Sequence, residues 1–408
     1  MVNEISNNNK RKLFLVSPML HQGGFERVCI TTARLLQDEF DVTIIIFSDK
    51  DIAYDVNGLN IVNLDVPVNH DLIGKVTNVF KRANRLKHWK KTVKPEICYS
   101  FGPTANRVNC LSTVKGVKTY TGIRNYTDIE NKKQTLFVGN RSDLIICCAR
   151  EIENYLNTKL HFNNTATLYN LYDISKISSE SEGDLPEWPW PSNKDADGND
   201  LKVIISMGRD DDQKCFWHML KAFKLVHDEM KNTRLVLLGA GSFDNYKKLS
   251  KDLGIEDAVY FAGMRKDPYK FLKRADLYLL TSANEGFPNA LVEGMSLGLT
   301  PVATNCLTGP AEILLESPDI TVKKADDMLM SSEGTESVIY GDYGVLVPVM
   351  STERNLDPND LKEEENLSRV LLKVLQNEDL MKNYGTKARL RAEKFNYDEY
   401  KKQFMSLT

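Results

Sequence analysis

The sequence has no long apolar segment. None of its apolar runs reaches the roughly 20 residues that a membrane-spanning helix needs. The opening stretch, MVNEISNNNKRK, also lacks the apolar core of a secretory signal. We therefore expect a cytoplasmic protein that associates with a membrane only peripherally, on the inner face of the cell membrane.

Three further signatures are missing. The net charge is −3, so no overall basicity points to nucleic acid as a partner. The seven cysteines form no C-x-x-C pair and lie mostly in apolar segments, which favours reduced core thiols over disulfides or zinc ligands. No G-x-G-x-x-G is present, so the sequence does not support a dinucleotide site.

What the sequence does contain is a repeated alternation of apolar strands and amphipathic helices. The 408 residues, 42% of them hydrophobic, suit two domains that each have a sizeable core. Residues 178–200 lack periodicity and are rich in Ser, Pro, Gly and acids, so we interpret them as a linker, with two tryptophans that can dock on a domain surface. We predict α/β domains over 1–177 and 201–385, and a helix over 386–408 that packs back on the first domain.

The most informative stretch is 276–314. It predicts a strand, a polar loop over 283–289, a helix and a second short strand, which together make one unit of a parallel sheet. Free N–H groups at a helix start suit a phosphate or sugar oxygen. Glu285 and Glu293 bracket this loop, and a carboxylate can accept hydrogen bonds from a pair of sugar hydroxyls.

Two cations precede this stretch. Arg209 and Lys214 follow a predicted strand and precede a helix, where they suit a diphosphate. The alternative is surface charge paired with the intervening aspartates. In the first half, Gly23 and Gly24 lie between a strand and a helix, where backbone N–H groups can approach a phosphate, although a glycine pair also makes plain turns.

A strongly basic helix is predicted from Lys75 to Lys94. It contains eight Lys or Arg residues and no acid, and its apolar residues fall on one stripe. Such a helix can lie on an anionic membrane surface. Alternatively, the stripe packs on the sheet and the charges are simply solvated.

Polar side chains follow several strands of the first half. In open parallel sheets ligands bind beyond the carboxyl ends of strands, so these side chains are candidate acceptor contacts, although ordinary loop polarity explains any one of them alone. They are Ser100, Asn106, Arg124 and Asn125, with His21 as a weaker candidate.

Three motifs resemble those of the retaining glycosyltransferases of family 4, which have the GT-B fold of two Rossmann-like parallel-sheet domains facing across a cleft. They are G-R-x4-K at Gly208 to Lys214, E-G-F-P-N-x3-E at Glu285 to Glu293, and the Gly-Gly-x-Glu at Gly23 to Glu26. The segment from Asn305 to Leu314 is similar to D-C-x-x-G-P-x-E-I-L of a bacterial subgroup that extends lipid-linked glycans, with Asn in place of the usual Asp.

The resemblance implies a role for each matching position. Arg209 and Lys214 would clamp the donor diphosphate and stabilise charge on the departing nucleotide, so that neither a metal nor another cofactor is needed. Glu285 would contact the donor sugar as the third catalytic residue, and Glu293 the ribose. The remaining implied donor contacts are Gly24, Gly239, Met264, Arg265, Gly286, Phe287, Pro288 and Asn289. Of these, Met264 and Arg265 would border the base through backbone atoms.

One departure concerns the acceptor side. Many members of the resembled family carry a His after the fourth strand of the first domain, whereas this strand ends in Ser100 and Phe101. The resemblance implies transfer of a hexose or N-acetylhexosamine from a UDP-sugar to a lipid-linked or polymeric glycan, as in capsule or exopolysaccharide assembly. Two alternatives are a sugar-nucleotide 2-epimerase of the same fold and a non-catalytic partner or chaperone of another transferase.

Overall fold

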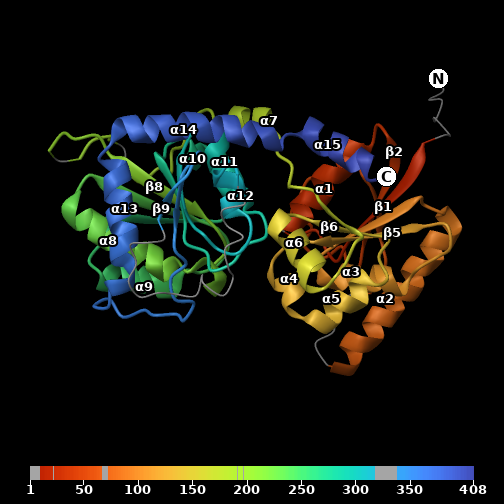
Figure 1. Ribbon diagram of the computed structural model, residues 1–408. Coiled ribbons are helices and arrows are strands. Elements are labelled where there is room, and N and C mark those ends of the chain that lie inside the picture. The colour runs from red at the N-terminus through yellow and green to blue at the C-terminus, as the bar shows by residue number, and fades with distance from the viewer. Residues whose placement is uncertain (1–9, 22, 67–71, 191, 196, 318–337) are drawn as a thin grey trace, which may run out of the picture. The chain divides into compact units, whose positions relative to one another are not determined.

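The structure is a computed structural model that describes residues 10–21, 23–66, 72–190, 192–195, 197–317 and 338–408 (Figure 1). The chain forms two compact units. Unit 1 comprises Met1–Leu171 and Tyr397–Thr408, and unit 2 comprises Tyr172–Asn396. The chain thus enters unit 2 several residues before the predicted linker, and it returns to unit 1 later than residue 386.

Unit 1 is built on a parallel sheet of seven strands in the order β3-β2-β1-β4-β5-β6-β7. This order reverses direction between β1 and β4, the point where open parallel sheets bind ligands. The strands are β1 (Arg11–Ser17), β2 (Phe40–Ile46), β3 (Asn60–Asn63), β4 (Ile97–Phe101), β5 (Lys118–Ile123), β6 (Leu144–Cys147) and β7 (Thr165–Thr167).

Helices cover both faces of this sheet (Figure 1). On one face α1 (Gly24–Leu36) and α15 (Tyr397–Ser406) complete a core with the strands, and Phe404 meets Phe40 edge-on. On the other face α2 (Leu72–Val93) and α3 (Pro103–Leu111) contribute a second core. The remaining helices of unit 1 are α4 (Thr127–Glu130), α5 (Lys132–Gly139) and α6 (Arg150–Lys159).

The basic helix α2 uses part of its charge inside the unit. Lys90 is fully buried, and its Nζ lies 2.6 Å from Asn109 Oδ1 on α3. Arg82 is also buried and donates two hydrogen bonds to the Val66 carbonyl, and burial lowers the pKa of its guanidinium. These two cations therefore hold the helix in place and are not available to a surface.

Unit 2 is built on a second seven-stranded sheet, in the order β10-β9-β8-β11-β12-β14-β13. All its strand pairs are parallel except β13 with β14. The strands are β8 (Lys202–Met207), β9 (Thr233–Leu238), β10 (Val259–Gly263), β11 (Leu277–Leu280), β12 (Thr300–Thr304), β13 (Ile339–Tyr340) and β14 (Val345–Val347). Two parallel-sheet α/β domains are the predicted fold class, which the structure confirms.

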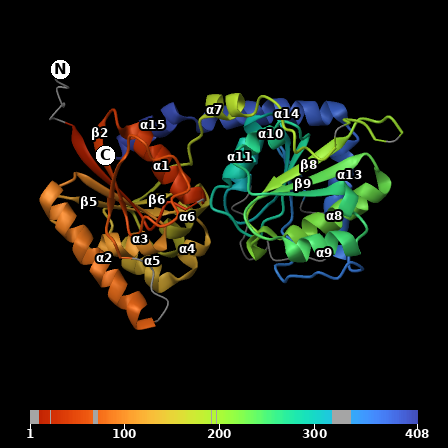
Figure 2. The same ribbon diagram turned by 180° about the vertical axis from the view of Figure 1, so that it is seen from behind.

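Helices again cover both faces of the sheet (Figure 2). The helices α8 (Phe216–Glu229), α9 (Asp244–Asp252) and α13 (Glu365–Leu375) contribute to a core of unit 2. The other face is covered by α10 (Pro268–Leu272), α11 (Asn289–Ser296) and α14 (Glu378–Ala392). The short elements of unit 2 are α7 (Ile174–Glu180), α12 (Pro310–Leu314), and the 3-10 turns η1 (Asp212–Lys214), η2 (Glu256–Ala258), η4 (Lys362–Glu364) and η5 (Glu393–Phe395).

The predicted linker is an integral part of unit 2. Trp188 packs 6.0 Å from Phe271, and Trp190 lies 6.4 Å from Tyr260, both measured between ring centroids. Aromatic contacts of this kind bury large apolar areas. The segment is therefore docked on the unit even though its composition resembles that of a free linker.

All seven cysteines are buried and free. Burial raises the pKa of the Cys215 thiol to about 12, so it is a neutral packing group. No helix in the described part of the chain is long and apolar enough to cross a bilayer.

The Lys90–Asn109 contact generates a stability prediction. Asn109→Leu keeps the side-chain volume but leaves the buried Lys90 ammonium without its side-chain acceptor. It also removes the Asn109 amide donor from the Cys98 and Tyr120 carbonyls. We expect a loss of about 3 kcal/mol in the free energy of unfolding, measured as a shift of the urea midpoint.

The matched control is Asn84→Leu, on the exposed side of α2, which should change the free energy of unfolding by at most about 0.5 kcal/mol. Equal losses in both variants would contradict the role of Asn109.

Candidate functional site

The candidate site lies at the carboxyl ends of β8, β9 and β11 in unit 2. The stretch 276–314 forms the predicted strand, loop, helix and strand, namely β11, residues 281–288, α11 and β12. Helix α11 begins at Asn289 after Pro288, and no side chain caps its first turn. The first turn of α11, in which the Leu291 amide donates to the Pro288 carbonyl at 3.2 Å, therefore follows directly on the loop that carries Glu285.

A buried ion pair connects this loop with the cations that follow β8. Lys214 Nζ lies 2.6 Å from Glu285 Oε1, and the two side chains are 20% and 9% exposed. A carboxylate this deeply buried needs a counter-charge. The structure thus brings together two residues that the sequence places 71 positions apart.

Hydrogen bonds reinforce this connection. The Ala283 amide donates to the Gln213 carbonyl at 2.9 Å, and Gln213 Nε2 donates to the Asn284 carbonyl at 2.6 Å. Thr281 Oγ1 also donates to the Lys214 carbonyl. The turn η1 and the loop after β11 are therefore one structural element, in which Lys214 has a fixed position.

Arg209 differs from Lys214 in its exposure. Its side chain is 69% exposed, and its Nη2 lies 3.8 Å from Asp211 Oδ2. Pairing with an intervening aspartate, the alternative expected from the sequence, thus describes Arg209 but not Lys214. An exposed guanidinium at this distance keeps most of its hydrogen-bonding capacity for a bound anion.

Glu293 is held by Tyr269, a residue that no sequence motif indicates. It is 3% exposed, and the Tyr269 hydroxyl on α10 donates to its Oε1 at 3.1 Å. Asn289 in turn accepts from the Tyr172 hydroxyl at 2.7 Å. Neither tyrosine lies in a recognisable motif, because each acts from an element distant in sequence.

Close backbone approaches explain two glycines. A Cβ at Gly239, whose φ is 151°, would lie 1.7 Å from the Gly208 carbonyl oxygen. A Cβ at Gly309, whose φ is 94°, would lie 2.7 Å from the Gly286 carbonyl. Only glycine allows these loops to pack against each other. The predicted ligand role of Gly239 is untested, but its packing role is clear.

The predicted base contacts lie after β10. Met264 is 61% exposed. Arg265 directs its guanidinium to the Tyr260 hydroxyl at 3.0 Å and toward Glu187 at 3.8 Å. Its side chain is thus engaged within unit 2, which is compatible with the predicted role because that role uses backbone atoms only.

In unit 1, the glycine loop precedes α1 as expected. Gly24 is the first residue of α1, and Gly23 exchanges hydrogen bonds with the Tyr54 hydroxyl at 2.7 and 3.0 Å. His21 Nε2 lies 3.1 Å from the Met19 sulfur. The contribution of these residues to a ligand site stays a prediction.

The candidate acceptor residues of unit 1 divide into two pairs. Ser100 and Asn106 are buried, bond to each other at 2.8 Å, and join β4 to β5 through the Gly122 carbonyl. Arg124 and Asn125 are half-buried, and their backbone amides donate to Asp128. The first pair therefore has a structural use, whereas acceptor contact by any of the four stays a prediction.

Residues 191–329 match the sequence profile of the family described as "Glycosyl transferases group 1". An uncharacterized glycosyltransferase of Methanocaldococcus jannaschii is 32% identical over 275 residues, which are 65% of this chain and 63% of that protein. The N-acetylgalactosamine-N,N'-diacetylbacillosaminyl-diphospho-undecaprenol 4-alpha-N-acetylgalactosaminyltransferase of Campylobacter jejuni is 24% identical over 403 residues, covering 95% of this chain and 96% of that one.

Solved structures share the fold. The Anabaena protein HepE in complex with UDP and glucose superposes with a TM-score of 0.70 at 15% identity, covering 97% of this chain and 98% of that chain. WaaG, a glycosyltransferase involved in lipopolysaccharide biosynthesis, gives a TM-score of 0.67 at 15% identity, with 97% and 99% covered. Both superpositions cover nearly the whole of this chain, so the predicted fold of two parallel-sheet α/β domains is confirmed.

The Lys214–Glu285 pair leads to a second stability prediction. Lys214→Met leaves a buried carboxylate without a counter-charge, so we expect the free energy of unfolding to fall by about 3 kcal/mol. Adding Glu285→Gln removes that charge and should restore most of the loss. Calorimetric melting temperatures would show the difference, and Arg209→Met, at a side chain that is 69% exposed, is the control that should melt like the wild type. A double variant no more stable than Lys214→Met would show that the pair is not the source of the effect.

Proposed function

This chain carries a Glycosyl transferases group 1 domain, and from that premise we propose that it is a retaining glycosyltransferase that works without a metal ion. It transfers a hexose or N-acetylhexosamine from a nucleotide sugar, preferably a UDP-sugar. The observation that carries the proposal is the fixed Lys214–Glu285 pair beside exposed Arg209 and buried Glu293, all in unit 2.

Each of these groups suits one part of a nucleotide sugar. Arg209 and Lys214 supply positive charge for the diphosphate. Glu293, oriented by Tyr269, can accept from the two ribose hydroxyls. Glu285 is a hydrogen-bond acceptor for the sugar hydroxyls, and the positive end of the α11 dipole lies at the same loop.

The same groups suggest how transfer proceeds. The bond between the anomeric carbon and the diphosphate oxygen breaks, and charge develops on the leaving phosphate. Arg209 and Lys214 stabilise that charge, which is electrostatic catalysis. The acceptor hydroxyl attacks from the same face, through an oxocarbenium-like state, and its proton passes to the leaving phosphate oxygen. Glu285 is held by Lys214, so it positions the sugar and does not act as a nucleophile.

For the acceptor, we propose a lipid-linked or polymeric glycan in capsule or exopolysaccharide assembly. The name of the Campylobacter relative, which spans nearly the whole chain, describes transfer to a diphospho-undecaprenol-linked sugar. The UDP and glucose bound by the fold neighbour HepE support a UDP-linked hexose as donor.

We also propose that helix α2 lies on an anionic membrane surface. Val76 and Phe80 are 58% and 56% exposed and lie one turn apart, so they share a side of the helix. Lys81 and Lys91 are exposed, in contrast to Arg82 and Lys90. Exposed apolar residues beside cations favour the interface of an anionic bilayer. The side chain of Lys75 lies outside the described residues.

The site assignment predicts two different kinetic defects. Lys214→Ala removes charge stabilisation of the leaving group and should lower kcat by about 10²–10³. Glu293→Gln weakens charged hydrogen bonds to the ribose and should raise the donor KM by about 10–100-fold. Transfer would be measured with a panel of UDP-hexoses and UDP-N-acetylhexosamines and a lipid-linked acceptor.

Two controls accompany that measurement. Lys251→Ala, exposed on α9, should leave both constants unchanged. The assay is repeated in EDTA, where wild-type transfer should persist because Arg209 and Lys214 take the place of a metal. Loss of activity in EDTA would refute metal independence, and full activity of Lys214→Ala would refute the proposed clamp.

The membrane proposal predicts a loss of binding. Lys81→Gln/Lys91→Gln should weaken sedimentation with phosphatidylserine-containing vesicles by about 30-fold, since each lysine near the surface is worth about 1 kcal/mol. Lys247→Gln/Lys251→Gln, on α9 of unit 2, removes the same charge from another exposed helix and should bind as the wild type does. If both pairs bind alike, the charges of α2 are simply solvated.

A further inference from the structure

The diphosphate clamp contains an electrostatic problem. Asp210, Asp211 and Asp212 lie between Arg209 and Lys214. Three carboxylates in the loop proposed to bind a diphosphate would repel that ligand unless their charge is compensated. The structure assigns each of them a different partner.

Asp210 and Asp211 are compensated locally. Asp210 Oδ2 accepts from the Phe243 amide at 2.9 Å, at the start of α9, where the helix dipole favours negative charge. Asp211 Oδ1 accepts from the Gln213 amide at 3.0 Å, and its other oxygen lies 3.8 Å from Arg209. Both acids therefore help to build the turn that they belong to.

Asp212 is compensated from a distant segment. Its Oδ1 lies 3.2 Å from Nη1 of Arg354, a residue more than 140 positions later in the chain. The Arg354 guanidinium also lies 5.1 Å from the centre of the Tyr246 ring on α9, a distance typical of a cation–π contact. Asp212 itself is 63% exposed in its side chain, so without Arg354 its charge would face the solvent beside Lys214.

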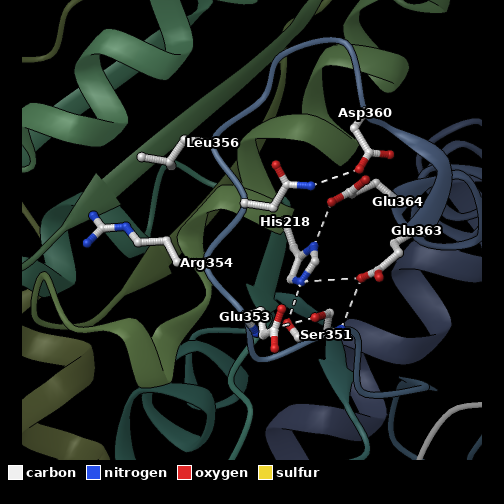
Figure 3. A pocket seen from close by; sticks show the side chains of 9 residues that line it. His218, Ser351, Glu353, Arg354, Leu356, Asp360, Glu363 and Glu364 are labelled. Carbon is white, nitrogen blue, oxygen red and sulfur yellow. Dashed lines mark hydrogen bonds and ion pairs between the residues drawn. The ribbon is translucent and has the colours of Figure 1, made fainter.

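The segment that carries Arg354 is anchored to α8 by His218 (Figure 3). His218, in the first turn of α8, is 2% exposed. Its Nδ1 lies 2.6 Å from Glu364 Oε1, and its Nε2 lies 2.8 Å from the Ser351 carbonyl. Both ring nitrogens therefore contact an oxygen acceptor of the segment that carries Arg354.

These residues line a cavity of about 380 Å³ whose wall carries Arg354. Figure 3 shows the Arg354 side chain directed away from His218. The cavity is thus the space beneath a strap, residues 351–364, which is fixed at Ser351 and Glu364 and which presents Arg354 to Asp212.

We propose that Arg354 is a positioning residue for donor binding, which acts through Asp212. By neutralising Asp212 it keeps the potential at the clamp positive, and by holding η1 it keeps Lys214 in place. The inference rests on the proposed function, because it assumes that Arg209 and Lys214 bind a diphosphate. It adds a residue that lies outside the motifs and far from them in sequence.

The test is a double-mutant cycle on UDP binding, measured by isothermal titration calorimetry at low and high salt. Arg354→Gln should weaken UDP binding about five- to tenfold at low salt, because Asp212 is then uncompensated. In 0.5 M salt this defect should shrink, since exposed charges are screened. Arg354→Lys, which keeps the charge, should restore most of the affinity.

The decisive variant is Arg354→Gln/Asp212→Asn. Removing the uncompensated acid should return UDP affinity to within about twofold of the wild type, since coupled residues show non-additive effects. A strap that only supports the fold would show equal defects in the single and double variants, insensitive to salt, and that result would overturn the inference. Arg369→Gln, which breaks a comparable exposed pair with Glu365 at 3.1 Å on α13, should leave UDP binding unchanged.

The same experiment distinguishes failure of the proposed function from failure of the role of Arg354. If the wild type binds neither UDP nor another nucleoside diphosphate from a panel of GDP, ADP and CDP, the proposed function fails. If the wild type binds UDP and Arg354→Gln binds it equally well at low salt, the proposed function stands and the role of Arg354 fails. Melting temperatures of all variants show whether a loss of binding reflects loss of the fold, in which case Arg354→Lys and the double variant decide.

Discussion

The buried pair of Lys214 and Glu285 is the constraint on which the geometry of unit 2 depends. The Glu285 carboxylate is only 9% exposed and needs a counter-charge. The Lys214 ammonium supplies it, which connects the segment after β8 with the loop after β11. The turn η1 follows, and it is fixed by Gln213 and Thr281. An anion that binds here therefore contacts Lys214 in a position that is already fixed. Because Lys214 is also paired with Glu285, binding requires a redistribution of hydrogen bonds but little movement of the backbone.

The architecture was predictable because buried strands produce short apolar runs that a single sequence displays clearly. The unit from β11 to β12 and the two α/β domains follow from that signal. The division into units differs in detail from the expectation. Composition at 178–200 resembles a linker, yet Trp188 and Trp190 pack against Phe271 and Tyr260, which lie 70 or more positions later. Composition reports local flexibility but not the distant surface that a tryptophan can cover.

The candidate site was predictable where a motif concentrates its residues, as at Arg209, Lys214, Glu285 and Glu293. It was not predictable where a side chain arrives from elsewhere, as Tyr269 does at Glu293 and Arg354 at Asp212. For a related reason, the number of basic residues in α2 overstates how many of them are available at the surface. Lys90 is buried and donates to Asn109, whereas its neighbour Lys91 is exposed to solvent. The sequence alone does not distinguish these two lysines, because the difference arises from packing.

The return of the chain to unit 1 affects how the protein is made. Tyr400 and Phe404 belong to the same buried core as β1 and α1, and Tyr400 bonds to Thr32 at 2.9 Å. Unit 2 is continuous from Tyr172 to Asn396, so its entire sequence is synthesised before α15 exists. During translation the core of unit 1 therefore stays incomplete until α15 is synthesised, whereas unit 2 can already fold completely. The usual order, in which the N-terminal domain folds first, is thus reversed for the last step of this fold.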